Sequence, residues 1–96
     1  MTNELSLALF SEHVEESFAF AHPALAGLSL QLVAVTALPD HGGPRQPFSI
    51  TFRGPQAPLL PQRTYRLEHG TLGALDVFIV PVGREAGGVV YEAVFN

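Results

Sequence analysis

The sequence predicts an all-β domain: a small antiparallel barrel or sandwich of about six strands, with one short N-terminal helix. Three observations support this. Apolar and polar residues alternate over most of the chain after residue 17, as expected of strands with one buried face. Glycine and proline, 9 and 8 of 96 residues, divide the chain into segments spaced roughly 10 to 15 residues apart. With 47% hydrophobic and 15% charged residues, the chain can bury a core of its own.

The first expected element is a helix at about residues 6–16. Ser6 is a suitable N-cap, and Leu7, Phe10 and Val14 recur at three- and four-residue spacing, which is typical of a helix with one apolar side. A helix this short is marginal when isolated. We therefore expect it to pack on the sheet as a cover over an open end of the core.

Six strands are expected after the helix. The segment FSITFR shows the pattern, with phenylalanine and isoleucine alternating with serine, threonine and arginine. The expected strands cover residues 17–22, 28–38, 48–53, 64–69, 74–82 and 88–95. Residues 83–88, GREAGG, indicate a hairpin loop between the last two strands. No linker is long enough to divide residues 1–96, so we expect a single domain.

Composition restricts the classes of partner and location. A net charge of −4 argues against nucleic-acid binding, because phosphate contacts need clustered cations. The absence of cysteine excludes disulfides and thiolate metal sites. No apolar run is long enough to span a membrane, and the N-terminus lacks the basic region of a signal peptide. We expect a protein that is cytoplasmic as synthesised, although it can still join an exported or surface assembly.

No metal-binding or catalytic constellation is visible among the histidines. Those at positions 13, 22, 41 and 69 never fall two apart on a strand or four apart on a helix, so no pair forms a ready metal site. Distant histidines can still converge in the fold. Asp40 and His41 are interpreted as polar loop residues, and His69, at a strand end, is expected to tie down a turn carbonyl. We expect no cofactor.

Hydroxyl and carboxyl groups also lack the settings that catalysis needs. Ser49 and Thr51 lie on the polar side of an expected strand without a glycine elbow. Glu68, Asp76 and Glu92 each sit alone on a different strand. They are interpreted as solvated residues or as partners of arginines such as those at positions 53 and 66.

The segment RGPQAPLLPQRTYRLEH, residues 53–69, carries the most distinctive pattern. Pro55, Pro58 and Pro61 recur every third residue, the period of a polyproline II helix. One interpretation is a docking ridge for a partner protein; the other is that Leu59 and Leu60 close the barrel end while the prolines stiffen a connection. Exposure of these leucines decides between the two. The candidate partner surface is Pro55, Pro58, Leu59, Leu60, Pro61 and Gln62.

Several short motifs occur once each in the second half of the chain. They are Phe-x-Gly-Pro at residues 52–55, Leu-Pro-Gln-x-x-Tyr-x-Leu-x-His at 60–69, Leu-Gly at 72–73, Pro-Val-Gly at 81–83 and Tyr-Glu-Ala-Val-Phe-Asn at 91–96. On these motifs the chain resembles a bacterial family of small β domains of unknown function. Arg63 departs from the pattern, which has glycine there. The resemblance implies no assigned reaction and an association with proteins similar to phage tail collar or tail fibre components.

Two classes of function remain open. We expect a non-enzymatic structural or protein-interaction module, an accessory or subunit of a phage-tail-like or filamentous bacterial assembly, which binds a protein partner or itself. The high share of hydrophobic residues favours this, because apolar surface left exposed calls for a partner. The alternative is a small-molecule or carbohydrate-binding barrel, or a minor enzyme, with a mouth lined by Asp40, Tyr65, Arg66 and His69. A pocket in which these four residues converge favours the alternative.

Overall fold

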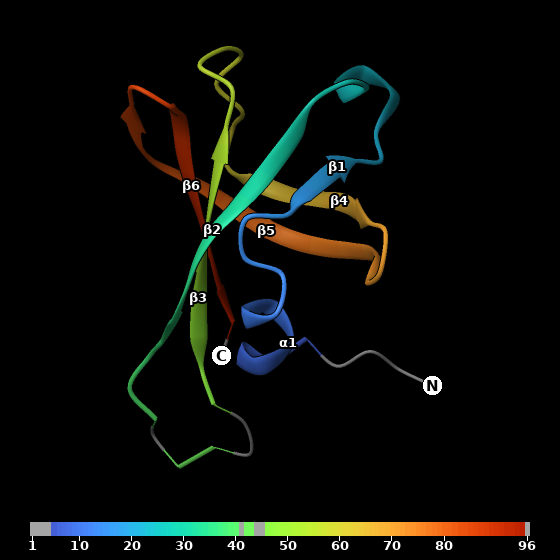
Figure 1. The fold of residues 1–96 in the computed structure, drawn as a ribbon. Coiled ribbons are helices and arrows are strands. Elements are labelled where there is room, and N and C mark those ends of the chain that lie inside the picture. Colours follow the sequence, from blue (N-terminus) through green and yellow to red (C-terminus); the bar gives the residue numbers. More distant parts are fainter. Residues whose placement is uncertain (1–4, 41, 44–45, 96) are drawn as a thin grey trace.

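The computed structural model describes residues 5–40, 42–43 and 46–95, and these form a closed six-stranded antiparallel barrel (Figure 1). The all-β class is confirmed. Around the ring the order is β1-β2-β3-β6-β5-β4, and β4 returns to β1. In chain order the elements are α1 (Leu7–Ser11), β1 (Ser17–Phe20), the 3₁₀ helix η1 (Pro23–Leu25), β2 (Ser29–Ala37), β3 (Phe48–Gly54), β4 (Arg63–His69), β5 (Gly73–Glu85) and β6 (Gly88–Phe95).

The core lies inside the ring and is built from the alternating apolar residues. In β4 and in the first half of β5, every second side chain is buried and its neighbours face outward. This is the period of two that predicted the strands. The fully buried large side chains are Phe10, Phe18, Leu30, Leu32, Phe48, Ile50, Phe52, Leu67, Val77, Ile79, Val89 and Tyr91.

The strands are paired over very unequal lengths. β3 with β6, and β4 with β5, each pair over seven residues. In contrast, β1 meets β4 over two residue pairs only, Ala19 with Glu68 and Phe20 with Leu67. We call this short contact the seam. Bulges between Leu32 and Ala34, and between Pro81 and Gly83, bend β2 and β5, and bending of this kind helps a small sheet to close on itself.

Helix α1 is shorter than predicted, because it ends at Ser11 instead of continuing to residue 16. Its start is as expected, since the Ser6 hydroxyl accepts a hydrogen bond from the Leu9 amide at 3.1 Å. The helix ends early because the segment after it is hydrogen-bonded to β2. Glu15 has a φ of +78°, and the amide of Glu15 and the carbonyl of Glu16 bind the backbone of Leu32. The segment after α1 is therefore held along β2 and cannot remain helical.

Two strand boundaries differ from the predicted ones by more than one residue. β1 ends at Phe20, because the His22 ring caps η1 by accepting from the Ala24 amide at 3.0 Å. β5 runs to Glu85 and β6 starts at Gly88, so the predicted loop over residues 83–88 reduces to a tight turn. Gly88 has a φ of +141°, and a Cβ there would lie 1.9 Å from the Gly54 carbonyl oxygen. Only glycine fits this turn.

Helix α1 covers one open end of the barrel, as its amphipathic pattern predicted (Figure 1). The Phe10 side chain has no exposed area. Its ring lies 5.6 Å from that of Phe95, 5.8 Å from that of Phe48 and 6.4 Å from that of Phe18, measured between centroids. One aromatic side chain thus joins the helix to three different strands.

We expect Phe10→Ala to lower the free energy of unfolding by about 3–5 kcal/mol, because it removes the aromatic contacts and leaves a cavity. Urea unfolding followed by circular dichroism measures this. Val14→Ala, at a side chain that is 37% exposed, is the matched control and should change the free energy of unfolding by no more than about 0.5 kcal/mol. Equal effects of the two changes would contradict the role assigned to Phe10.

Candidate functional site

A pocket opens where β1 and β4 part, and we call it the β4 pocket. Its walls are residues 20–25, 60–61 and 63–66, and its volume is about 310 Å³. The Phe20 and Tyr65 rings meet edge to face inside it, with centroids 5.4 Å apart. Figure 1 shows the η1 turn and the connection between β3 and β4 at the same end of the barrel, away from α1. The lining is mostly apolar, as is usual for binding pockets.

Tyr65 and Arg66, two polar residues of the β4 pocket, already make structural hydrogen bonds. The Tyr65 hydroxyl donates to the Pro61 carbonyl at 2.6 Å, and burial raises the pKa of Tyr65, so the hydroxyl keeps its proton. Arg66 donates to both carboxylate oxygens of Asp76, at 2.9 and 3.0 Å. These hydrogen bonds lower the pKa of Asp76. The Arg63 guanidinium lies 5.7 Å from the centre of the Tyr65 ring, a cation–π arrangement.

The four residues predicted to line a barrel mouth do not converge. Tyr65 and Arg66 line the β4 pocket. His69 instead faces Glu16, and the Asp40 carboxylate accepts from the Gly42 amide in the connection between β2 and β3. His41 lies outside the described residues.

The proline-rich connection, residues 55–62, is called the strap. Its two leucines have opposite surroundings: Leu60 is 6% exposed and Leu59 is 56% exposed. The buried Leu60 amide donates to the Tyr91 hydroxyl at 3.0 Å. Leu60 is therefore placed to close the end of the barrel, as one interpretation predicted, while Leu59 faces solvent. Docking of a partner on this segment stays a prediction.

The strap is not the continuous polyproline II turn that proline spacing predicted. The chain bends at residues 56–58, and the Ala57–Pro58 bond is cis. Gln56 holds the first part of the strap by donating to the carbonyls of Glu85 and Ala86, at 2.7 and 3.0 Å. Arg53 also reaches Glu85, at 3.1 Å. The strap is thus fixed to the β5–β6 turn at one end and to the β4 pocket at the other.

We expect Tyr91→Phe to destabilise the domain by about 1–3 kcal/mol, because it leaves the buried Leu60 amide without a partner. Hydrogen exchange followed by NMR should show faster exchange at the Leu60 amide in the variant. Leu59→Ala, at the neighbouring exposed position, is the control and should leave that exchange rate unchanged. Unchanged protection of the Leu60 amide in Tyr91→Phe would show that the hydroxyl does not hold the strap.

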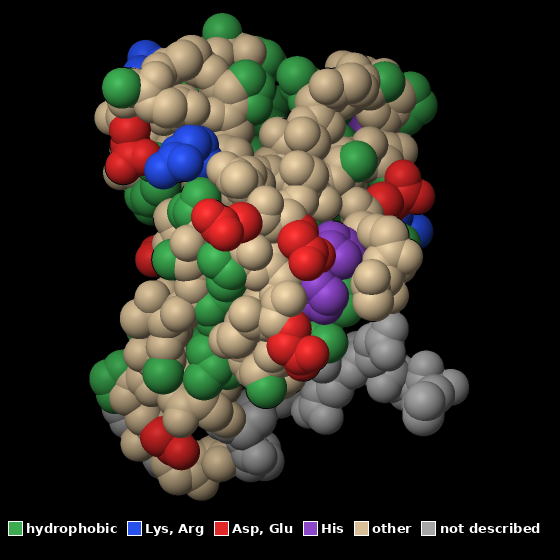
Figure 2. All heavy atoms as spheres, viewed as in Figure 1, with side chains coloured by type: hydrophobic (Ala, Val, Ile, Leu, Met, Phe, Trp, Pro, Cys, Tyr) green, Lys and Arg blue, Asp and Glu red, His purple; other side chains and the backbone are tan. Residues whose placement is uncertain are grey.

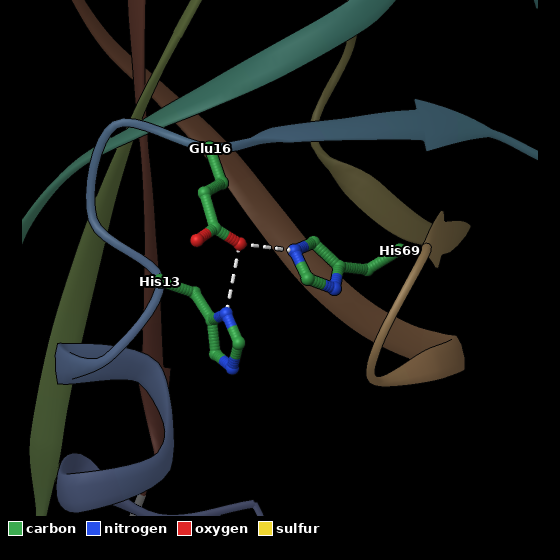
Figure 3. Close-up of side chains that lie close together, drawn as sticks. All are labelled: His13, Glu16 and His69. Carbon is green, nitrogen blue, oxygen red and sulfur yellow. Dashed lines mark hydrogen bonds and ion pairs between the residues drawn. The ribbon is translucent and has the colours of Figure 1, made fainter.

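A cluster of two histidines and one glutamate lies beside the seam, at the other end of β1. We call His13, Glu16 and His69 the histidine cluster. His13 and Glu16 belong to the connection between α1 and β1, His69 ends β4, and all three side chains point toward one another (Figure 3). Glu16 Oε1 lies 2.8 Å from His13 Nδ1 and 2.6 Å from His69 Nε2. Figure 2 shows histidine side chains among acidic ones on this face.

The ligand atoms of the histidine cluster lie within 4.8 Å of one another, which is close enough for one metal ion to contact all three. The tautomer of His69 opposes this. His69 Nδ1 accepts from the amides of Thr71 and Leu72, at 3.0 and 3.1 Å. The proton of the neutral ring therefore sits on Nε2 and points to Glu16, so that nitrogen has no lone pair for a metal. His69 does tie down the turn, but through amides and not through the predicted carbonyl.

The histidine cluster works as a hydrogen-bonded clamp around one carboxylate. Hydrogen bonds from His13 and His69 lower the pKa of Glu16 below its ordinary value. The His13 and His69 side chains are 14% and 6% exposed, whereas Glu16 is 47% exposed. Sequence reasoning missed this group because Glu16 and His69 are 53 positions apart, and no local pattern links them.

We expect the stabilising effect of Glu16 to disappear in acid. Because the folded state favours the carboxylate, this contribution is fully present above the ordinary carboxyl pKa of about 4.3. It is lost as the pH falls through the lowered pKa of Glu16 in the folded protein. The free energy of unfolding of the wild type should therefore exceed that of Glu16→Gln at pH 5–6 and converge with it toward pH 2. Urea unfolding as a function of pH measures the difference.

Glu12→Gln, an exposed position in the same segment, controls for the removal of one carboxyl group. A constant difference between the wild type and Glu16→Gln across this pH range would contradict the clamp.

We also expect Zn²⁺ not to stabilise the protein. Binding at one hundred times the Kd would add about 2.7 kcal/mol to the free energy of unfolding. The His69 tautomer leaves only His13 and Glu16 as ligands, which is too few for a structural zinc site. Thermal unfolding with and without Zn²⁺ tests this. A gain in stability that His13→Gln abolishes would show that the histidine cluster rearranges to bind metal.

Comparison with known proteins places the chain in a family. Residues 5–95 match the domain of unknown function DUF6916. The chain belongs to this family. The match covers α1 and all six strands, which agrees with the predicted membership of a family of domains of unknown function. No curated protein and no solved structure matches the chain. Within the described residues, no helix has the length and apolar character needed to cross a bilayer.

Proposed function

We propose that this DUF6916 domain is a non-enzymatic protein-interaction module that binds its partner at the β4 pocket. The observation that carries the proposal is the state of the pocket's polar groups. Tyr65 and Arg66 are held by Pro61 and Asp76, and the His22 ring caps η1. A general base or nucleophile needs a group that is free to exchange a proton with a substrate. An apolar pocket in which Tyr65, Arg66 and His22 already hold structural hydrogen bonds favours binding over chemistry.

The strap extends the same surface beyond the pocket. Leu60 and Pro61 form part of the pocket wall, and the next residue toward the N-terminus, Leu59, exposes 56% of its surface. An exposed leucine beside an apolar hollow favours a partner that covers both. The candidate partner surface predicted from the sequence is thus continuous with the β4 pocket, because Leu60 and Pro61 belong to both. That surface consists of Pro55, Pro58, Leu59, Leu60, Pro61 and Gln62.

A second apolar region supports assembly into a larger structure. Phe78, Val82 and Val94, on β5 and β6, expose 51%, 56% and 51% of their surface. Val82 is the additional residue at the β5 bulge, which turns its side chain outward. These residues favour a module that contacts more than one neighbour. The narrower proposal of a bacterial phage-tail-like or filamentous assembly rests on the sequence resemblance.

We expect a photoreactive amino acid at position 59 to cross-link the domain to a protein partner in its native cells. The same amino acid at Ser29, an exposed position on β2, is the control site. Leu25→Arg, which places a long charged side chain in the pocket wall, should reduce the cross-link at position 59 by at least about tenfold.

Mass spectrometry of the adducts provides the readout, and light scattering of the pure protein reports self-association. Equal labelling from positions 59 and 29 would count against the proposal. A bound small molecule found by native mass spectrometry, with no protein adduct, would favour the alternative of a small-molecule or carbohydrate-binding barrel.

A further inference from the structure

We infer that the partner enters the β4 pocket as an extended strand that adds to the free edge of β4. One apolar side chain of the partner fills the pocket and an acidic group lies beside Arg63. This inference rests on the proposed function, because it names the form and chemistry of the partner at that site.

The free edge follows from the register of β4. In an antiparallel sheet, alternate residues direct their N–H and C=O groups to the same neighbouring strand. The Arg66 carbonyl accepts from the Ala21 amide at 2.9 Å, so Arg66 faces β1. Thr64 lies two residues earlier and faces the same side. Arg63 and Tyr65 face β5, opposite Ile79 and Val77.

No strand meets Thr64 on that side within the described residues. The register between β1 and β4 stops at Phe20 and Leu67, and the chain then turns away into η1. Thr64 is exposed and pairs only with Phe78 of β5, on the other side. Its N–H and C=O are therefore open at the mouth of the pocket. Unpaired groups of this kind are the usual template for strand addition.

The pocket lies beside this edge and supplies the apolar contact. Thr64 itself forms part of its wall, together with apolar residues from β1, η1, the strap and β4. Side chains of an added strand alternate between the two faces of the sheet, so one of them can enter the pocket that Phe20 and Tyr65 help to line. Because the open edge is short, the side chain in the pocket contributes most of the affinity. The backbone hydrogen bonds to β4 set the register of the added strand.

The positive charge of the pocket wall favours an acidic partner. The pocket wall contains Arg63, Arg66 and His22 and no acidic residue, in a chain whose net charge is −4. Arg66 is neutralised by Asp76. Of the described carboxylates, none lies within ion-pair distance of Arg63, whose guanidinium is held over the Tyr65 ring instead. A carboxylate next to the apolar anchor of the partner would pair with Arg63 at the pocket rim.

The inference is tested with synthetic peptides on the intact chain. An array of blocked peptides of about six residues, alternating phenylalanine or valine with glutamate, yields a parent binder, whose Kd is measured by fluorescence anisotropy. The parent is then remade twice with N-methyl groups on alternate backbone nitrogens, once in each phase. If the peptide adds as a strand, one phase should weaken the Kd by at least about tenfold and the other should not, because only one phase faces β4.

Variants of β4 test the backbone hydrogen bonds between Thr64 and the peptide from the protein side. Thr64→Pro removes the N–H at an edge position whose N–H points away from β5, where proline is tolerated. We expect it to weaken the Kd by at least about tenfold, whereas the matched control Thr64→Val should retain the affinity of the wild type. Arg63→Glu should reverse the preference, so that peptides alternating with lysine bind better than those with glutamate. Circular dichroism checks folding, and if Thr64→Pro unfolds, the two N-methylated peptides decide the question.

Each result separates the inference from the proposed function. Equal binding of both N-methylated peptides would overturn strand addition while leaving an interaction module in place. Equal binding of purely apolar peptides would overturn the acidic partner. Failure of the whole array, combined with no cross-link from position 59, would overturn the proposed function as well. A cross-link from position 59 without any peptide binding would keep the interaction module and reject its extended acidic partner.

Discussion

The barrel depends on the seam, because a six-stranded sheet becomes a ring only where β1 reaches β4. That contact consists of two residue pairs, whereas β3 with β6 and β4 with β5 share seven each. At one end of the seam, Glu16 and His69 join the segment before β1 to the last residue of β4. At the other end, the strands separate and leave the β4 pocket. The histidine cluster and the β4 pocket therefore lie at the two ends of the seam.

The ends of the barrel are closed by different means. Phe10 fills one end from a helix that the chain forms before the first strand. The other end is covered by the strap, through Leu60 and its hydrogen bond to the Tyr91 hydroxyl. Tyr91 also lies close to Gly54, where an added Cβ would come within 3.1 Å of the ring. The absence of a side chain at Gly54 thus allows Tyr91 to reach the strap.

The strands were predictable because burial of one sheet face imposes a period of two on the residues themselves. What the sequence could not show depends on contacts between distant positions. Leu59 and Leu60 are identical and adjacent, yet only Leu60 is buried, since its amide is held by a hydroxyl 31 residues later. Likewise, the helix stops at Ser11 because Glu15 and Glu16 bind β2. Of the residues that line the β4 pocket, the predicted barrel mouth included only Tyr65 and Arg66. The opposite wall is the η1 turn, which no pattern in the sequence connects with β4.

Unequal pairing around the ring also sets the order in which parts of the domain open. The amides of β3 and β6 are locked by seven-residue ladders, so they should be released only with global unfolding. Strand β1 is held by three residue pairs to β2 and two to β4, which makes it the first strand to detach in local fluctuations. In such an opened state the free edge of β4 lengthens toward His69. While β1 is detached, the barrel thus offers an added strand a longer edge of β4 to pair with than the closed barrel does.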